Sequence, residues 1–254
     1  MALFQRLFFA VLLAGLISGA AMAALQQWRI VPLILAAEVY ETAAPEEPVA
    51  AAHEHEAGTP AHSHDAAAPA HDHGDDEWAP ADGMERNLFT IAATTFAAIG
   101  FAFVLSAASV LTGFEVTARN GVIWGMAGFA IFQLAPALGL APELPGMPAA
   151  DLVARQIWWW GTAIATATAI YGFARFRNWP AIIVGIALIL LPHIIGAPQL
   201  AGEHESGVPA HLATEFAATT LFVGFAFWAV LGPLYGYLVE RLAQRSIATA
   251  EVTA

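Results

Sequence analysis

The chain has 254 residues, of which 58% are apolar and only 12% charged, about half the charged fraction of a typical soluble domain. It contains no cysteine and no lysine, which excludes disulfides, thiolate metal sites and a Walker-type nucleotide site that depends on lysine. The net charge of −12 argues against a nucleic-acid partner, because phosphate binding needs a basic surface.

Six apolar stretches have roughly the 20 residues that a helix needs to cross a bilayer. In chain order they cover residues 3–25, 87–111, 121–140, 157–174, 179–195 and 214–238. We therefore predict an all-α fold, a polytopic transmembrane helical bundle with six spans. The pattern divides the chain into a first helix with an outer extension (1–36), a disordered His- and acid-rich outer loop (37–86), a five-helix bundle (87–240) and a cytoplasmic tail (241–254).

The first apolar stretch has two interpretations. Arg6, an apolar run and then Ala21-Met22-Ala23 fit a signal peptide with its cleavage site, which would leave five spans. However, the apolar pattern resumes over residues 30–35, as expected for a retained helix with an outward extension. Both interpretations give the same topology for the rest of the chain.

Arginine positions predict the orientation, because short cytoplasmic loops are enriched in basic residues. A cytoplasmic N-terminus places six arginines inside and leaves Arg29, Arg86 and Arg155 outside. The inner six are Arg6, Arg119, Arg175, Arg177, Arg241 and Arg245. All but three of the 21 carboxylates, and all nine histidines, then lie outside or at the outer membrane edge. The outer face is therefore predicted to be rich in cation ligands.

The middles of the predicted spans carry no charged side chain. Their polar residues include Thr94, Thr95, Gln133, Thr162, Thr166, Thr168, Thr219 and Thr220. No carboxylate relay, haem-binding histidine pair or nucleophile–base pair is apparent, so we expect neither an enzyme nor a resident cofactor. Close helix packing is favoured by three glycine pairs at a spacing of four: Gly15 and Gly19, Gly121 and Gly125, and Gly232 and Gly236.

Three consecutive nine-residue blocks between Ala52 and Trp78 each begin with Ala-His-x-His. They supply six histidines among acidic residues: His53, His55, His62, His64, His71 and His73. Imidazole suits borderline divalent ions such as Zn, Ni, Co and Cu(II). Histidines at i and i+2 share one face of an extended chain, so two pairs can supply four imidazoles to one ion. The segment is predicted to be disordered without metal, and a solvated spacer is the alternative interpretation.

The outer edge of the last two spans carries further candidate ligands. His193 lies in the last turn of its span, and the loop that follows carries His204 and His211. Glu215 follows His211 by four residues and would share its helical face. Glu143 lies in the rigid turn Pro142-Glu143-Leu144-Pro145-Gly146, where it could bind metal or pair with Arg155.

The chain resembles the CbtA family, the predicted cobalt transporter subunits of bacteria. The most specific matching elements are the Pro-Glu-Leu-Pro-Gly turn at residues 142–146 and Pro192-His193-Ile194-Ile195-Gly196-Ala197-Pro198. Other matches include Val31-Pro32-Leu33-Ile34, Gly121-Val122-Ile123-Trp124-Gly125 and Arg155-Gln156-Ile157-Trp158-Trp159. The resemblance implies an inner-membrane protein that supports cobalamin synthesis, with a small single-span His-rich companion of the CbtB type. It also adds Glu38 to His193 and Glu143 as candidate ligands, because all three lie in family motifs.

The residues and the resemblance together predict a protein of the bacterial inner membrane with a cytoplasmic N-terminus and a periplasmic His-rich loop. We expect it to capture Co(II) through that loop and pass the ion inward, with a hand-off site near His193, His204, His211 and Glu143. Two alternatives stay open. One is a nickel or zinc transporter, because His and carboxylate ligands do not favour cobalt. The other is a metal-capturing or sensing subunit that transports nothing itself.

Overall fold

The computed structural model describes residues 2–42, 80–200 and 206–253, and the regular structure in these ranges is entirely helical. The helices are α1 (Ala2–Leu25), η1 (Gln26–Ile30), α2 (Val31–Thr42), α3 (Met84–Thr112), α4 (Gly121–Phe129), η2 (Ala130–Leu134), α5 (Ala135–Ala137), α6 (Leu152–Phe176), α7 (Trp179–Ile195) and α8 (Ala210–Thr253). Each of the six predicted apolar stretches is helical over most of its length, which confirms the all-α bundle.

Three helical stretches are long and apolar enough to cross a membrane: Phe4–Tyr40, Met84–Thr112 and Ala210–Gln244. Gly121–Ala137 and Trp179–Ile195 are apolar but shorter. At about 1.5 Å per residue, the 17-residue α7 is about 26 Å long, close to the lower limit for a span. The 25-residue α6 has the necessary length but is less apolar, because it carries three consecutive tryptophans and several threonines.

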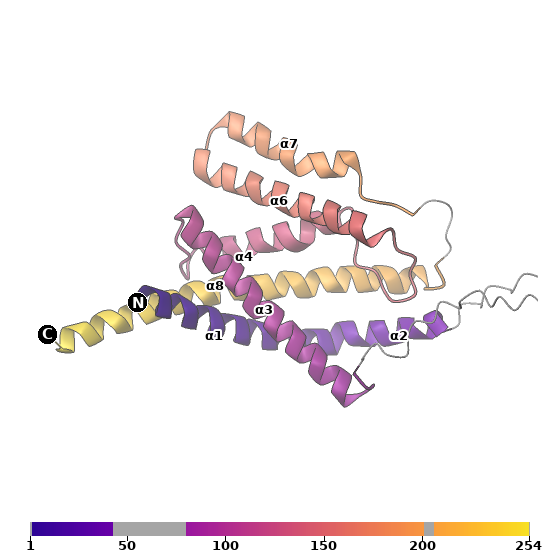
Figure 1. Cartoon of the computed structure of the whole chain (residues 1–254), viewed down its shortest axis with the longest axis horizontal. Helices are drawn as coiled ribbons and strands as arrows, with labels where there is room; N and C mark the ends of the chain where they lie inside the picture. The colour runs from indigo at the N-terminus through magenta and orange to yellow at the C-terminus, as the bar shows by residue number, and fades with distance from the viewer. Residues whose placement is uncertain (1, 43–79, 201–205, 254) are drawn as a thin grey trace, which may run out of the picture.

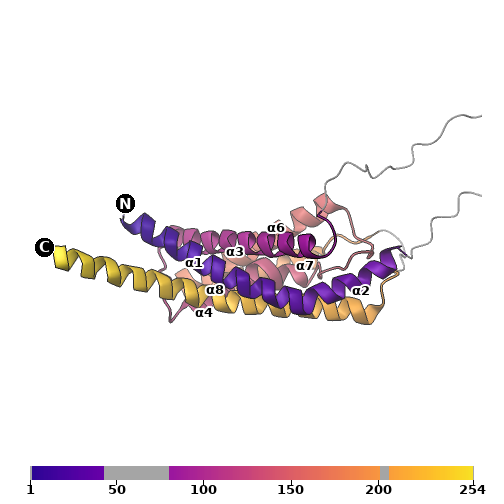
Figure 2. The same cartoon turned by 90° about the horizontal axis from the view of Figure 1, so that it is seen from below.

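Most of the helices run roughly parallel or antiparallel to one long axis, whereas α3 lies obliquely to it (Figures 1 and 2). Figure 1 shows α4 between the α6–α7 hairpin and α8, while α3 crosses α1. Both chain termini lie at one end of the bundle. The opposite end holds the C-terminal ends of α2 and α7 and the N-terminal ends of α3, α6 and α8. We call this opposite end the ligand end, because the described candidate ligands lie there.

Glycines allow the helix backbones to approach closely. A Cβ atom on Gly15 would come within 2.5 Å of the Ile99 Cα atom, so α1 lies directly on α3. A Cβ on Gly121 would lie 2.5 Å from the carbonyl oxygen of Gly232, and one on Gly236 would meet the backbone of Thr117. All three predicted glycine pairs are therefore at close helix contacts, which confirms that prediction.

The main core lies where α1, α3 and α8 meet. α8 supplies Phe227, Trp228, Leu231 and Tyr235, which pack against small side chains of α1 and α3. The Tyr235 hydroxyl donates a hydrogen bond of 2.8 Å to Ser106 Oγ on α3. This bond satisfies a polar group that would otherwise be costly to bury.

A second, smaller core lies toward the ligand end. It combines Ile30 and Ala37 of the first helical stretch with Leu144 of the α5–α6 connection. Val208, Leu212, Phe216 and Val223 from the start of α8 and the residues before it complete this core. It fixes the Pro-Glu-Leu-Pro-Gly turn, which contains Leu144, against α8.

The first helix extends further than its predicted boundary. α2 continues to Thr42 and α3 begins at Met84, so the predicted loop 37–86 starts inside one helix and ends inside another. The reason lies in tertiary contacts, because Ala37 is fully buried and Glu38 pairs with Arg86. α1 contributes Ala10 and Val11 to the main core, the packing that a retained helix requires. Its retention in the mature protein stays a prediction.

Candidate metal-handling site

The α5–α6 connection brings Glu143 to Arg155. Asp151 caps α6 by accepting a 2.8 Å hydrogen bond from the Ala154 amide, so Arg155 lies in the first turn of this helix. Arg155 Nη2 donates to Glu143 Oε2 at 2.6 Å. Both side chains are about 30% exposed, at 27% and 29%. The pairing that the sequence left open is therefore formed.

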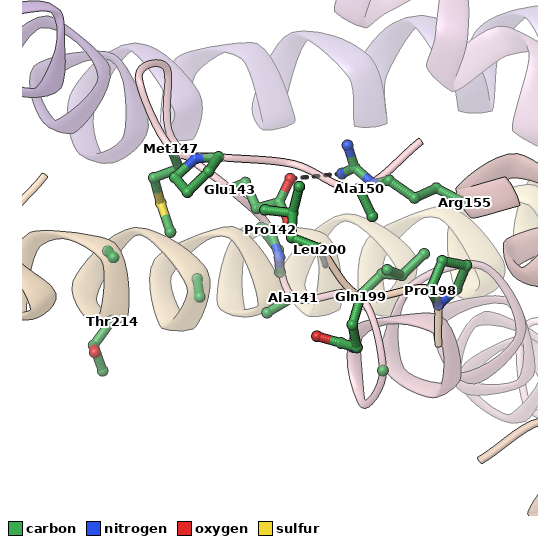
Figure 3. Close-up of a pocket in the computed structure, with 15 residues that line it drawn as sticks. Ala141, Pro142, Glu143, Met147, Ala150, Arg155, Pro198, Gln199, Leu200 and Thr214 are labelled. Atoms are coloured by element: carbon green, nitrogen blue, oxygen red, sulfur yellow. Dashed lines mark hydrogen bonds and ion pairs between the residues drawn. The ribbon is translucent and has the colours of Figure 1, made fainter. Parts of the chain in front are cut away.

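Two cavities meet at this ion pair. The outer one, about 450 Å³, lies between the α5–α6 connection, residues 198–200 and the first turns of α8. The inner one, about 380 Å³, lies between η2, α5, the start of α6 and α8. Glu143 and Arg155 line both cavities. Figure 3 shows the Glu143 carboxylate directed at the Arg155 guanidinium in the wall of the outer cavity.

The inner cavity extends deeper along α8. Thr214 lines the outer cavity and Thr220 lines the inner one, a separation of about 9 Å along the helix axis. Gln133 of η2 also lines the inner cavity. The side-chain oxygens Gln133 Oε1 and Thr220 Oγ1 are buried and have no hydrogen-bond partner.

His193 lies in the last turn of α7 against Trp158 of α6. The two rings meet edge to face with their centroids 5.7 Å apart. The Trp158 indole N–H donates a 3.1 Å hydrogen bond to the carbonyl of Pro192, which fixes the tryptophan beside the histidine. The His193 Nε2 atom is buried and has no hydrogen-bond partner. It is therefore a nitrogen that a metal or a proton donor could still engage.

Glu38 pairs with Arg86 between α2 and α3. Arg86 Nη1 donates to Glu38 Oε2 at 3.3 Å, and Nη2 contacts the other carboxylate oxygen. Arg86 Nη1 also lies 3.4 Å from Asp82 Oδ1. Two of the candidate carboxylate ligands, Glu38 and Glu143, are thus each neutralised by an arginine.

The chain matches a known protein family. The sequence profile described as "Probable cobalt transporter subunit (CbtA)" matches residues 4–240. The chain belongs to the CbtA family. No curated protein and no solved structure matches the chain. The family assignment supports a multi-pass membrane protein that acts as a subunit of a cobalt transporter.

In this CbtA-family chain the described ligand candidates stay apart. His211 and Glu215 lie in the first turns of α8 and are both exposed. Within the described ranges, no group of three His, Asp or Glu side chains is arranged to hold a metal ion. His204 and the six repeat histidines lie outside the described residues. The described residues alone therefore do not assemble the predicted hand-off site.

No local pattern in the sequence assigns a role to Gln133 or Thr220. Both are polar residues within apolar spans, but nothing local distinguishes them from Thr168, whose hydroxyl donates to the carbonyl of Ile164 in its own helix. Gln133 itself is the one indication in the sequence, because an apolar helix offers no hydrogen-bond partners for both the oxygen and the nitrogen of a glutamine side chain.

Proposed function

We propose that this CbtA-family protein captures Co(II) outside the bacterial inner membrane and passes it inward, supporting cobalamin synthesis. The observation that carries the proposal is the position of the helix ends that flank the His repeats in the chain. Both described flanks of the repeats, the end of α2 and the start of α3, lie at the ligand end of the bundle (Figure 1). The Glu143–Arg155 ion pair lies at the start of α6, at the same end.

The repeats would act as a collector. Six imidazoles on one segment raise the local ion concentration next to the cavities, and loose binding keeps exchange fast. The ion would then leave the imidazoles for His193 and the oxygen atoms of the cavity walls. We propose a small single-span His-rich companion of the CbtB type as a partner and expect no enzymatic activity of the chain itself.

The proposed orientation has a cytoplasmic N-terminus. Its support is that arginines predicted to be cytoplasmic, such as Arg119 in the α3–α4 connection, lie opposite the ligand end (Figure 1). The chain has no native cysteine, so single cysteines can report the side. Ala81→Cys should react with a membrane-impermeant maleimide in intact spheroplasts, and Glu115→Cys only after lysis. The reverse pattern would overturn the orientation.

Transport itself is tested by radiolabelled cobalt uptake into proteoliposomes, with and without the companion. We expect uptake by the unaltered chain and a raised half-saturation concentration when all six repeat histidines are replaced by asparagine. Nickel and zinc competition would identify the ion. Equal uptake by protein-free liposomes would overturn the transport proposal.

A capturing or sensing subunit without transport is the second candidate. It is favoured by the two ion pairs, Arg86 with Glu38 and Arg155 with Glu143, because each removes a free carboxylate from the ligand end. Cobalt binding to the purified protein without flux, even in the presence of the companion, would support this candidate over the transporter.

A further inference from the structure

Two residues that line the inner cavity, Gln133 and Thr220, each carry a buried side-chain oxygen that has no hydrogen-bond partner. These atoms are Gln133 Oε1 and Thr220 Oγ1, and the cavity that both residues line has a volume of about 380 Å³. A buried acceptor without a partner loses its hydration and gains nothing in return. A ligand that engages both oxygens would recover that loss.

The side chain of Gln133, on η2, packs against the face of α8 that carries Thr220. Gly224 follows Thr220 by four residues and therefore shares its face of the helix. A Cβ atom on Gly224 would collide with Gln133 Oε1, so the glutamine side chain rests directly on this face. Gln133 also belongs to the π-helix η2, a type of segment that often occurs at functional sites.

We propose that Gln133 Oε1 and Thr220 Oγ1, together with the carboxylate of Glu143, form an oxygen site for a partly hydrated divalent cation. Glu143 lines the same cavity and is held by Arg155 at its border with the outer cavity. Entry of a cation would release Glu143 from Arg155, and the freed carboxylate would supply the negative charge that the two neutral oxygens lack. This inference rests on the proposed cobalt-handling function and names a binding site on its path.

The chemistry of the site suits passage of an ion. Six waters occupy roughly 180 Å³ at the liquid density of about 30 Å³ each, so a hydrated ion fits the cavity. Oxygen ligands favour Mg and Mn as well as Co, whereas imidazoles favour the later transition metals. Conduction requires sites that release the ion again, and a neutral oxygen pair with one carboxylate meets that need. Because the site contains only one His, Asp or Glu side chain, it is not a conventional metal-ligand cluster.

The test measures cobalt binding on the full chain with the six repeat histidines replaced by asparagine, so that the loop does not dominate the signal. Radiolabelled cobalt would be equilibrated with the detergent-purified protein by dialysis. Gln133→Leu and Thr220→Val should each weaken cobalt binding by at least about tenfold, the scale of one lost ligand interaction. Matched controls are Gln156→Leu, at the rim of the same cavity, and Thr219→Val, and both should bind as the parent does.

Competition by magnesium adds a second readout. Because the ligands are oxygens, millimolar Mg²⁺ should displace cobalt from the parent protein. The amount displaced should equal the amount of cobalt that the Gln133→Leu variant fails to bind. Thermal unfolding of the metal-free variants should be unchanged or raised, since each substitution removes an unpaired polar atom. Cobalt binding that is unchanged in both variants, or that magnesium does not affect, would overturn the site.

The test separates this inference from the transport proposal. If the purified protein binds cobalt at this site but proteoliposomes show no flux, the inferred site is supported and the transport proposal is refuted. Flux that persists unchanged in Gln133→Leu and Thr220→Val would keep transport and refute the inferred site.

Discussion

Arg86, in the first turn of α3, donates hydrogen bonds to both carboxylate oxygens of Glu38, near the end of α2. These residues are 48 positions apart and lie on either side of the His repeats. The ion pair therefore joins the two helix ends that flank the repeat segment in the chain. Its side chains are 36% and 32% exposed, so solvent weakens the attraction between the charges.

Removing either charge should cost little stability. Glu38→Gln and Arg86→Gln are each expected to lower the free energy of unfolding only slightly, because solvent weakens a partly exposed ion pair. The exchanged pair Glu38→Arg with Arg86→Glu should recover most of that loss. A double-mutant cycle from chemical unfolding in detergent measures the coupling, and a coupling of zero would mean that the pair contributes only to geometry.

His193→Phe separates ligand binding from packing. Phenylalanine keeps the edge-to-face contact with Trp158 and removes both imidazole nitrogens. If the Nε2 atom accepts cobalt on its path, uptake should fall by at least about tenfold while thermal stability is kept. Proteoliposome uptake and thermal unfolding of the same preparation give the two readouts. Full uptake in this variant would remove His193 from the path.

Gly232→Ala should be strongly destabilising. The new methyl group would collide with the carbonyl of Gly121 and force α4 away from α8. We expect a loss of about 1–3 kcal/mol, the usual cost of overpacking a tight contact. Gly100→Ala is the matched control, because a Cβ there meets no atom within 4 Å. That control should be neutral or stabilise α3 by about 0.5–1 kcal/mol, and equal losses in both variants would refute the close contact.

Gly224→Ala tests the shape of the inner cavity. Its methyl group would displace the Gln133 side chain from the face of α8 that carries Thr220. Cobalt binding in the loop-substituted background should weaken by about tenfold or more, as expected when a ligand is moved off its site. Gly172→Ala in α6 is the control, since a Cβ at that position is in open space. Binding that is equal in the two variants would show that the position of Gln133 is unimportant.

The sequence predicted the pair formed by Arg155 and Glu143 as one of two alternatives, because the two residues are 12 positions apart and joined by a short rigid turn. It did not predict the pair formed by Arg86 and Glu38, because the repeat segment separates them and loop length alone says nothing of where its ends lie. Glu38 entered only as a candidate metal ligand, whereas the structure shows it bound to an arginine.

The sequence by itself determined the helical bundle, the positions of its apolar helices and the glycine contacts, whereas α8 continues to Thr253 through the predicted tail. These follow from local properties, namely the length and hydropathy of a stretch and the absence of a side chain at a given position. Only the tertiary structure decided that Gln133 and Thr220, 87 positions apart, line one cavity behind Glu143. That proximity depends on how η2 packs against α8 and on the room left by Gly224, which no local pattern of residues encodes.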